Sequence, residues 1–175
     1  LDTDVEFLED FIAVREKYGY PRQFDCSWGK LKNEVFFGIV KRMQEVGMTS
    51  AFTIALQSLN PVALKNAGRA GMPLNVYDDL ADRLVKQGLH TYAELLWCLP
   101  GETSQSFLEG YDRLADKVSR IVVYPIVVVP NCGFDINRDK FGLVTAREER
   151  SDFEYLLSHN TLTLEENRRM HRVLF

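Results

Sequence analysis

The chain has 175 residues, of which 46% are hydrophobic, and a formal net charge of -4. These values predict one soluble domain with enough chain to bury a sizeable core. The acidic balance and the lack of a dense Lys/Arg block argue against nucleic acid as a partner, and the longest apolar stretch, residues 121–130, is too short to span a bilayer. Three widely separated cysteines give neither a disulfide framework nor a metal cluster and favour a reducing, cytoplasmic compartment.

The first half of the chain predicts alternating helices and strands. A capping-box pattern at Thr3–Glu6 begins a helix that Gly19 ends, and Asn60-Pro61 forms the expected start of another. Apolar and β-branched residues favour strands elsewhere. The predicted helices cover residues 3–18, 34–46, 60–67 and 76–87, and the predicted strands cover residues 23–28 and 50–58.

The second half begins with an apolar strand that Pro100-Gly101 stops, after which Thr103 can cap a helix. A second capping box, Thr163 to Glu166, precedes the last helix. The alternation predicts an α/β fold with a parallel sheet, either doubly wound or bent into a barrel. The remaining predictions are a strand over 121–129, a loop over 131–143, and helices over 104–118, 147–158 and 164–173.

Glu94 is an isolated carboxylate inside this apolar strand, which is costly unless it meets a donor or a hydroxyl-bearing ligand. Because side chains alternate along a strand, Gln57 and Glu94 can point to the same side of the sheet, near the carboxyl ends of their strands. Arg69 follows the strand of Gln57, on a Gly-flanked turn. A buried carboxylate suits a ribose diol, and arginine suits a carboxylate. The alternative is structural: Glu94 and Arg69 form an ion pair, and Gln57 binds backbone.

Other catalytic patterns are absent from the sequence. It contains no GxGxxG, GxxxxGK[ST], GxSxG or HExxH motif. The three histidines, His90, His159 and His171, are scattered over positions predicted to be exposed or in loops, so a catalytic or metal-binding role is not expected, with His159 the best of the three. We interpret Cys26, Cys98 and Cys132 as small buried or loop side chains.

Three segments together resemble the second half of the radical S-adenosylmethionine (radical SAM) core. They are Ala55–Pro61 followed by Gly68-Arg69, then Glu94–Thr103, then Val122–Pro130. The resemblance is closest to the subclass with a cobalamin-binding domain ahead of the core, and residues 153–166 resemble the extension after that core. The resemblance implies part of a six-stranded partial (β/α) barrel.

In that family, a glutamine and an arginine at these positions contact S-adenosylmethionine, the arginine through the methionyl carboxylate. The resemblance therefore implies cofactor contacts for Gln57 and Arg69. By the same resemblance, Glu94 binds the ribose hydroxyls and Leu96 touches the adenine. The substrate cavity is implied near Tyr124, Asn131, Phe134 and His159, which are candidates only.

The sequence departs from the family in one major respect. It lacks the CxxxCxxC loop whose thiolates bind the [4Fe-4S] cluster, and it has Cys98 where the family often has glycine, so that a side chain there could narrow the cavity. We therefore expect the C-terminal portion of a radical SAM enzyme, inactive alone, with the cluster loop and any cobalamin domain elsewhere. Its expected partners are a small-molecule substrate and the missing N-terminal part of the barrel.

Within the chain, we predict that residues 1–143 belong to the partial barrel and that residues 144–175 form a helical C-terminal extension. The alternatives are a natural cluster-less binding or scaffold module with the same fold, and an unrelated α/β domain in which Glu94 and Arg69 are merely paired.

Overall fold

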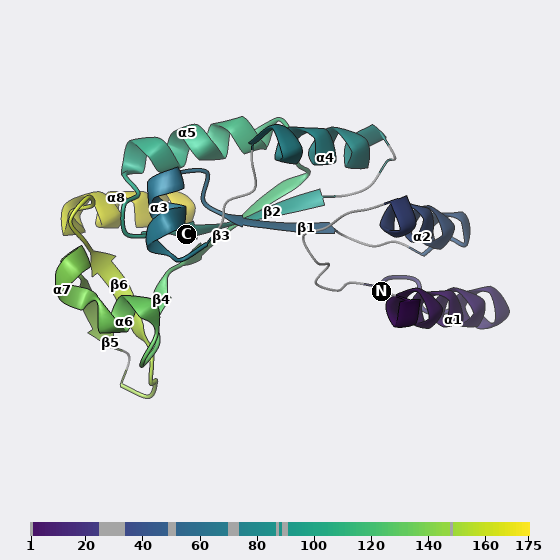
Figure 1. Cartoon of the computed structure of the whole chain (residues 1–175), viewed down its shortest axis with the longest axis horizontal. Coiled ribbons are helices and arrows are strands. Elements are labelled where there is room, and N and C mark those ends of the chain that lie inside the picture. The colour runs from purple at the N-terminus through teal and green to yellow at the C-terminus, as the bar shows by residue number, and fades with distance from the viewer. Residues whose placement is uncertain are drawn as a thin grey trace.

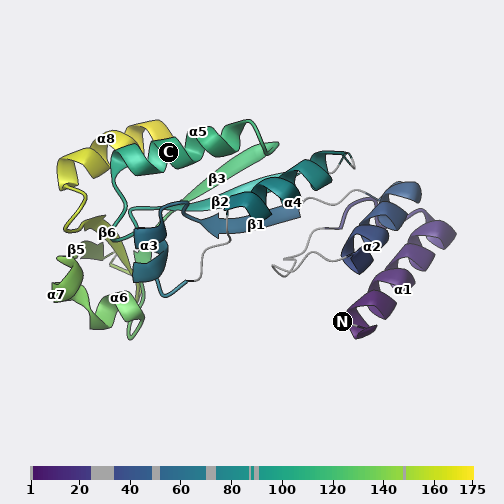
Figure 2. The ribbon, with the colours of Figure 1, turned by 45° about the horizontal axis from the view of Figure 1, so that its top comes forward.

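The computed structural model describes residues 2–24, 34–48, 52–69, 74–86, 88, 91–147 and 149–175. Within these ranges, helices and strands alternate through the central part of the chain, and a second group of short elements follows (Figures 1 and 2). The helices are α1 (Asp2–Tyr18), α2 (Glu34–Glu45), α3 (Pro61–Asn66), α4 (Leu74–Lys86), α5 (Ser104–Ala115), α6 (Gly133–Ile136), α7 (Arg138–Phe141) and α8 (Leu164–Leu174). The strands are β1 (Phe52–Gln57), β2 (Thr91–Trp97), β3 (Arg120–Pro125), β4 (Val127–Val128), β5 (Val144–Arg147) and β6 (Glu154–Ser158).

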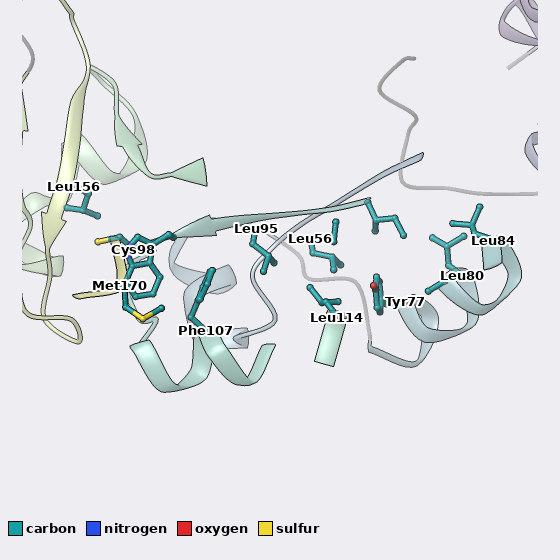
Figure 3. Close-up of a cluster of buried hydrophobic side chains, with 14 of the residues drawn as sticks. Leu56, Tyr77, Leu80, Leu84, Leu95, Cys98, Phe107, Leu114, Leu156 and Met170 are labelled. Carbon is teal, nitrogen blue, oxygen red and sulfur yellow. The ribbon is translucent and has the colours of Figure 1, made fainter. Parts of the chain in front are cut away.

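The first sheet is parallel and has the order β1-β2-β3. Its residues alternate regularly: Ala93 and Leu95 are buried, whereas Glu94 and Leu96 between them are only partly buried. Figure 3 shows Leu95 on the same side as side chains of α4 and α5, which pack over this face. The parallel α/β arrangement expected from the sequence is therefore present, with one face covered by helices and the other less covered.

The second sheet is antiparallel and has the order β4-β6-β5. The predicted helix over residues 147–158 is wrong, because this segment includes β6, which pairs with β5 and β4. The predicted loop over 131–143 is also wrong in part, since it contains α6 and α7. Residues 144–175 are thus a hairpin followed by α8 rather than an all-helical extension. The prediction missed the hairpin because residues 147–158 have mixed patterning that does not alternate clearly, and because the second partner of β6 is β4, which is distant in the sequence.

Helix α8 is attached to both sheets by one buried amide. Asn167 accepts a hydrogen bond from Trp97 Nε1 at 2.6 Å and donates one to the carbonyl of Leu157 at 2.7 Å. Trp97 ends β2 and Leu157 lies in β6, so Asn167 connects elements of the two sheets. Its burial beside Trp97 places these polar groups in the main core, where each finds a partner as required.

Helices α1 and α2 form a separate apolar cluster, built from Leu8, Ile12, Ile39, Met43 and Met48. The predicted strand over 23–28 lies largely outside the described residues; of it, only Gln23 and Phe24 are described. The described sheets contain three parallel strands and three antiparallel strands. The six-stranded partial barrel remains a prediction.

Candidate functional site

The turn that follows β2 is fixed by α3. Asn66 Nδ2 donates to the carbonyl of Pro100 at 3.0 Å, and Asn60 Nδ2 donates to the carbonyl of Gly101 at 3.2 Å. Gly101 has φ +98°, and a Cβ there would lie 2.8 Å from Asn66 Nδ2. Glycine is therefore required by both the backbone conformation and the close approach of α3. The turn brings the carboxyl ends of β1 and β2 together.

Glu102, the next residue, is a buried carboxylate that the sequence analysis did not single out. Ser58 Oγ donates to one of its oxygens and Ser106 Oγ donates to the other at 2.5 Å. Thr161 Oγ1 also donates to its carbonyl at 2.8 Å. Glu102 thus joins the end of β1, the start of α5 and the segment before α8. These partners satisfy a carboxylate that would otherwise be expensive to bury.

Glu94 lies on the less covered face of the parallel sheet. Its neighbours across the strands are Ala55 on β1 and Val122 on β3. Among the described residues the side chain of Glu94 makes no hydrogen bond or ion pair, and the side chain of Arg69 also has none, although its backbone N–H donates to the carbonyl of Leu64. The alternative in which Glu94 and Arg69 form a structural ion pair is therefore wrong. Both side chains keep their full capacity for a ligand.

Gln57 ends β1 in an unusual backbone conformation. Its φ is +65°, and the register with β2 shifts between Ala55 and Gln57. This irregularity interrupts the alternation, so the direction of the Gln57 side chain does not follow from the strand pattern. The residue is half-buried and stands at the carboxyl end of the sheet, next to Ser58 of the Glu102 network.

Arg69 and Leu96 line the same cavity, which has a volume of about 340 Å³. Gln57 and Glu94 are not among its lining residues, although Leu96 shares the face of Glu94. The cavity lies beyond the end of β2, between the segment after α3 and the short helices α6 and α7. Its full lining is Asn66, Ala67, Gly68, Arg69, Leu96, Leu99, Ile126, Cys132, Gly133, Phe134, Asn137, Lys140 and Phe141.

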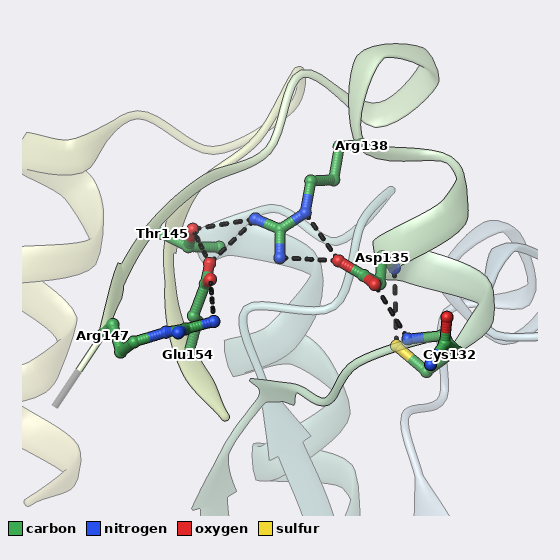
Figure 4. Close-up of polar contacts among 7 residues, drawn as sticks. Cys132, Asp135, Arg138, Thr145, Arg147 and Glu154 are labelled. Carbon is green, nitrogen blue, oxygen red and sulfur yellow. Dashed lines mark hydrogen bonds and ion pairs between the residues drawn. The ribbon is translucent and has the colours of Figure 1, made fainter. Parts of the chain in front are cut away.

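The wall made by α6 and α7 is held by an ionic network (Figure 4). Arg138 pairs with Asp135 at 2.7 Å and with Glu154 at 2.8 Å, linking α7 to α6 and to β6. The hydroxyl of Thr145 and then Arg138 lower the pKa of Glu154, and the backbone N–H of Asn131 and then Arg138 lower the pKa of Asp135. Both carboxylates therefore stay ionised at neutral pH.

The substrate-cavity candidates are distributed over different places. Phe134 lines the cavity, whereas Tyr124 and His159 do not. Tyr124 is 45% exposed and is the neighbour of Leu96 across the parallel sheet. Asn131, in the turn before α6, has φ +64° and is exposed. Sequence reasoning missed the cavity residues Asn137 and Lys140, because it predicted a loop there. Gly142, which caps the end of α7 with a positive φ, was the available signal.

His159 is buried, contrary to the prediction that the histidines are exposed or in loops. Its Nδ1 accepts a hydrogen bond from the backbone N–H of Thr161 at 3.3 Å, which places the ring proton on Nε2. Burial lowers the pKa of His159 to about 4, so the ring is neutral at physiological pH. Of the other two, His171 is exposed, and His90 lies outside the described residues.

Cys98 follows β2 with φ +72° and is almost completely buried. Its side chain belongs to the main core, near Leu156 and Met170 in Figure 3, and does not line the cavity. Burial raises the pKa of its thiol to about 12. Cys98 is therefore a neutral core side chain, as expected, and it does not narrow this cavity. Cys26 lies outside the described residues.

Within the described ranges, no three His, Cys, Asp or Glu side chains are grouped so that they could hold a metal ion. In the same part of the chain, no helix is both long and apolar enough to cross a membrane.

The chain shares its fold with solved radical SAM methyltransferases, and its curated relatives are methyltransferases, one of them cobalamin-dependent and radical SAM by name. The cobalamin-dependent radical SAM methyltransferase TokK of Streptomyces tokunonensis is 28% identical over 83% of the chain. The 2-(S-pantetheinyl)-carbapenam-3-carboxylate methyltransferase of Streptantibioticus cattleyicolor is 28% identical over 75% of it. No family model matches the chain.

Two solved structures of the radical SAM methyltransferase TsrM from Kitasatospora setae share the fold. One, with tryptophan and a SAM analogue bound, has a TM-score of 0.65 and 14% identity, covering 96% of this chain and 38% of TsrM. The other, with cobalamin and a [4Fe-4S] cluster bound, has a TM-score of 0.59 and 15% identity, covering 91% and 32%. The chain spans only 22% and 20% of the two curated relatives.

Proposed function

We propose that residues 1–175 are the C-terminal portion of the core of a cobalamin-dependent radical SAM enzyme, and that this enzyme is a methyltransferase. Two observations support this proposal: the two curated relatives are both methyltransferases, and the likeness to TsrM extends over almost the whole chain. The sequence contains no CxxxCxxC loop, so the cluster ligands belong to a part of the enzyme outside these residues. Alone, residues 1–175 would be inactive.

The proposed role of this portion is to bind S-adenosylmethionine along the less covered face of the parallel sheet. Glu94 would accept hydrogen bonds from the ribose hydroxyls, and Leu96 would contact the adenine. Arg69 would pair with the methionyl carboxylate, and Gln57 would donate or accept at the end of β1. The observation that carries this assignment is the absence of any internal partner for Glu94 and Arg69 among the described residues. Bound S-adenosylmethionine would supply the group-transfer and radical chemistry.

The donor set fits this ligand chemically. Glu94 is a half-buried acceptor, Arg69 carries five donors and lines the cavity, and Leu96, on the same face of β2 as Glu94, gives an apolar surface in the cavity lining. The distribution matches a molecule with a ribose, an aromatic base and a free carboxylate. Arg69 is exposed and is satisfied by water in the free protein, so the half-buried Glu94 is the stronger argument for a ligand.

Binding of S-adenosylmethionine to the full-length protein, measured by calorimetry, tests the assignment. We expect Glu94→Ala and Arg69→Ala each to weaken binding about 10- to 100-fold, as for the loss of a charge-assisted contact. Glu109→Ala on α5 and Arg172→Ala on α8 are matched controls at exposed positions and should bind normally.

Formation of 5'-deoxyadenosine by the same variants, with the cluster reconstituted, separates the enzyme from the scaffold. The enzyme requires that product to form in the wild type and to fall in the Glu94 variant. Normal cofactor binding by both site variants would refute the site. Cofactor binding without any turnover would favour the cluster-less module.

A further inference from the structure

The cavity has a wall that the proposed cofactor contacts do not use. Arg69 and Leu96 contribute one side, and α6 and α7 with the residues before them contribute the other. Glu94, the proposed ribose ligand, lies outside the lining. The side made by α6 and α7 is therefore available to a second molecule that meets the cofactor at Leu96.

The charged side chains that line the cavity are all positive. Arg69 and Lys140 are its two charged residues, and no Asp or Glu lines the cavity. Among the described residues, Lys140 has no ion pair. Its Nζ lies 4.9 Å from the ring centroid of Phe141, a cation–π contact that keeps the ammonium group beside apolar surface. An anionic group entering the cavity would thus meet an unpaired cation.

The backbone at Lys140 is well fixed, and its side chain is exposed. Its carbonyl accepts a hydrogen bond from Asn160 Nδ2 at 3.1 Å, and the preceding helix is anchored through Asn137 Nδ2, which donates to the carbonyl of Gly133 at 2.7 Å. Arg138, two residues before Lys140, is held by Asp135 and Glu154 (Figure 4). A wall held in this way loses little entropy when a ligand binds.

The neighbouring ionic network leaves the charge of Lys140 uncompensated. Asp135 and Glu154 contribute two negative charges, and the two arginines that face them, Arg138 and Arg147, contribute two positive charges. The network is therefore neutral in itself. Its carboxylates are engaged by these arginines, so they do not draw Lys140 away from the cavity.

We propose that this wall is the substrate subsite and that it takes a small carboxylate-bearing molecule with an apolar body. Lys140 pairs with the substrate carboxylate, and the rings of Phe134 and Phe141 contact the apolar part. The cavity volume of about 340 Å³ limits the substrate to a small molecule or to one end of a larger one. This inference rests on the proposed function, since it assigns the substrate of the same enzyme.

The test uses 3-phenylpropanoate as a probe and its neutral amide, 3-phenylpropanamide, as the comparison. Binding of each to the full-length protein is measured by ligand-observed NMR. We expect the carboxylate to bind more tightly than the amide, and Lys140→Met to weaken carboxylate binding about tenfold with less than a twofold effect on the amide. Lys140→Arg should restore most of the affinity.

Lys65→Met on α3 is the control, because it removes one exposed positive charge that does not line the cavity and should leave probe binding unchanged. Far-UV circular dichroism checks that each variant is folded. Equal binding of the carboxylate and the amide, no binding of either, or equal losses in Lys65→Met and Lys140→Met would overturn the inference. The inference would also be overturned if Arg69→Met weakened carboxylate binding and Lys140→Met did not.

Calorimetry with S-adenosylmethionine distinguishes the two proposals. Normal cofactor binding by Lys140→Met together with weaker carboxylate binding supports the substrate subsite. Weaker cofactor binding by Lys140→Met would instead show that Lys140 binds the methionyl carboxylate of the cofactor, and it would overturn this inference. If S-adenosylmethionine does not bind at all while the probe binds through Lys140, the proposed function fails and the anion site stands.

Discussion

At the scale of single residues, Cys98 combines a buried side chain with a left-handed backbone. A residue with a Cβ in this conformation costs about 1–2 kcal/mol relative to glycine, whereas removal of the buried thiol costs packing free energy. The φ of +72° is a conformation that glycine adopts without this cost, which agrees with the glycine that the radical SAM resemblance implies at this position. The backbone conformation at position 98 therefore favours glycine, whereas the packing of the core favours a buried side chain.

Comparison of Cys98→Ala with Cys98→Gly separates these demands. Both variants lose the buried sulfur, but only glycine relieves the backbone, so we expect Cys98→Gly to be more stable than Cys98→Ala by about 1 kcal/mol. Urea unfolding measures the difference. Ala93→Gly within β2, where φ is not positive, is the control and should lose about 1 kcal/mol. A less stable glycine variant at both positions would contradict the prediction.

His159 links stability to pH. Burial holds its pKa near 4 in the folded protein, below the ordinary value of 6.5, so the unfolded chain binds a proton that the folded chain does not. Above pH 6.5 the ring is neutral in both states and contributes no pH dependence. Between pH 6.5 and pH 4, the free energy of unfolding should therefore fall by about 1 kcal/mol per pH unit as pH falls.

Unfolding of His159→Gln in urea, followed at several pH values, tests this effect. The variant should lose most of the slope between pH 6.5 and pH 4; a loss of stability that is equal at every pH reflects changed packing and leaves the slope unaffected. His171→Gln, at an exposed position, should keep the slope of the wild type. Identical slopes in wild type and His159→Gln would show that other groups dominate this range.

At the scale of elements, the polar links between strands and helices determine the geometry of the site. The Glu102 network ties the residue after Gln57 to the start of α5, and Asn66 ties the turn after β2 to α3. The backbone near Gln57 and near Leu96 is therefore held by one set of hydrogen bonds, which we call the frame. It includes contacts between residues 44 positions apart, as for Ser58 and Glu102.

Removal of the Glu102 carboxylate should loosen this frame. We expect Glu102→Ala to lower the free energy of unfolding by about 2–4 kcal/mol, because the buried hydroxyl of Ser58 and the partly buried hydroxyl of Ser106 lose a charged acceptor. Glu102→Gln keeps one acceptor oxygen and should lose less. Thermal or urea unfolding measures both, with the exposed Glu109→Ala as the control. A loss below about 0.5 kcal/mol in Glu102→Ala would mean that water replaces the carboxylate at no cost.

The sequence predicted the elements whose signals are local. The caps at Asn60, Thr103 and Thr163 are present, with side chains that accept the expected backbone hydrogen bonds. The strand alternation also placed Glu94 and Leu96 on one face. The failures lie where the signal is weak or not local: residues 147–158 have mixed patterning, and β6 within them also pairs with the distant β4, as Tyr155 does with Val127.

The candidate site was predictable to a similar extent. The resemblance indicated Arg69 and Leu96, which line one cavity, but pattern alone could not find Lys140 on the opposite wall. The pairing of Trp97 with Asn167 joins residues 70 positions apart, and no periodicity signals such a contact. Likewise, alternation assumes a regular strand, and the positive φ of Gln57 breaks that assumption.

At the scale of the whole molecule, two apolar clusters share one helix. Phe37 and Val40 of α2 belong to the main core with the parallel sheet, whereas Ile39 and Met43 pack with α1. Helix α2 thus joins α1 to the rest of the described structure. Because α1 packs chiefly through α2, its local stability should be lower than that of the sheet.

Hydrogen exchange on two core variants tests this division. Ile12→Ala removes a completely buried side chain from the α1–α2 cluster and should cost about 2–5 kcal/mol within it. We expect faster exchange in α1 and in its half of α2, with β1–β3 still protected. Leu95→Ala, in the main core, should instead accelerate exchange throughout β1–β3. If Ile12→Ala accelerates exchange in the sheet as much as in α1, the two clusters unfold as one cooperative unit, and the site at the carboxyl end of the sheet depends on α1 for its stability.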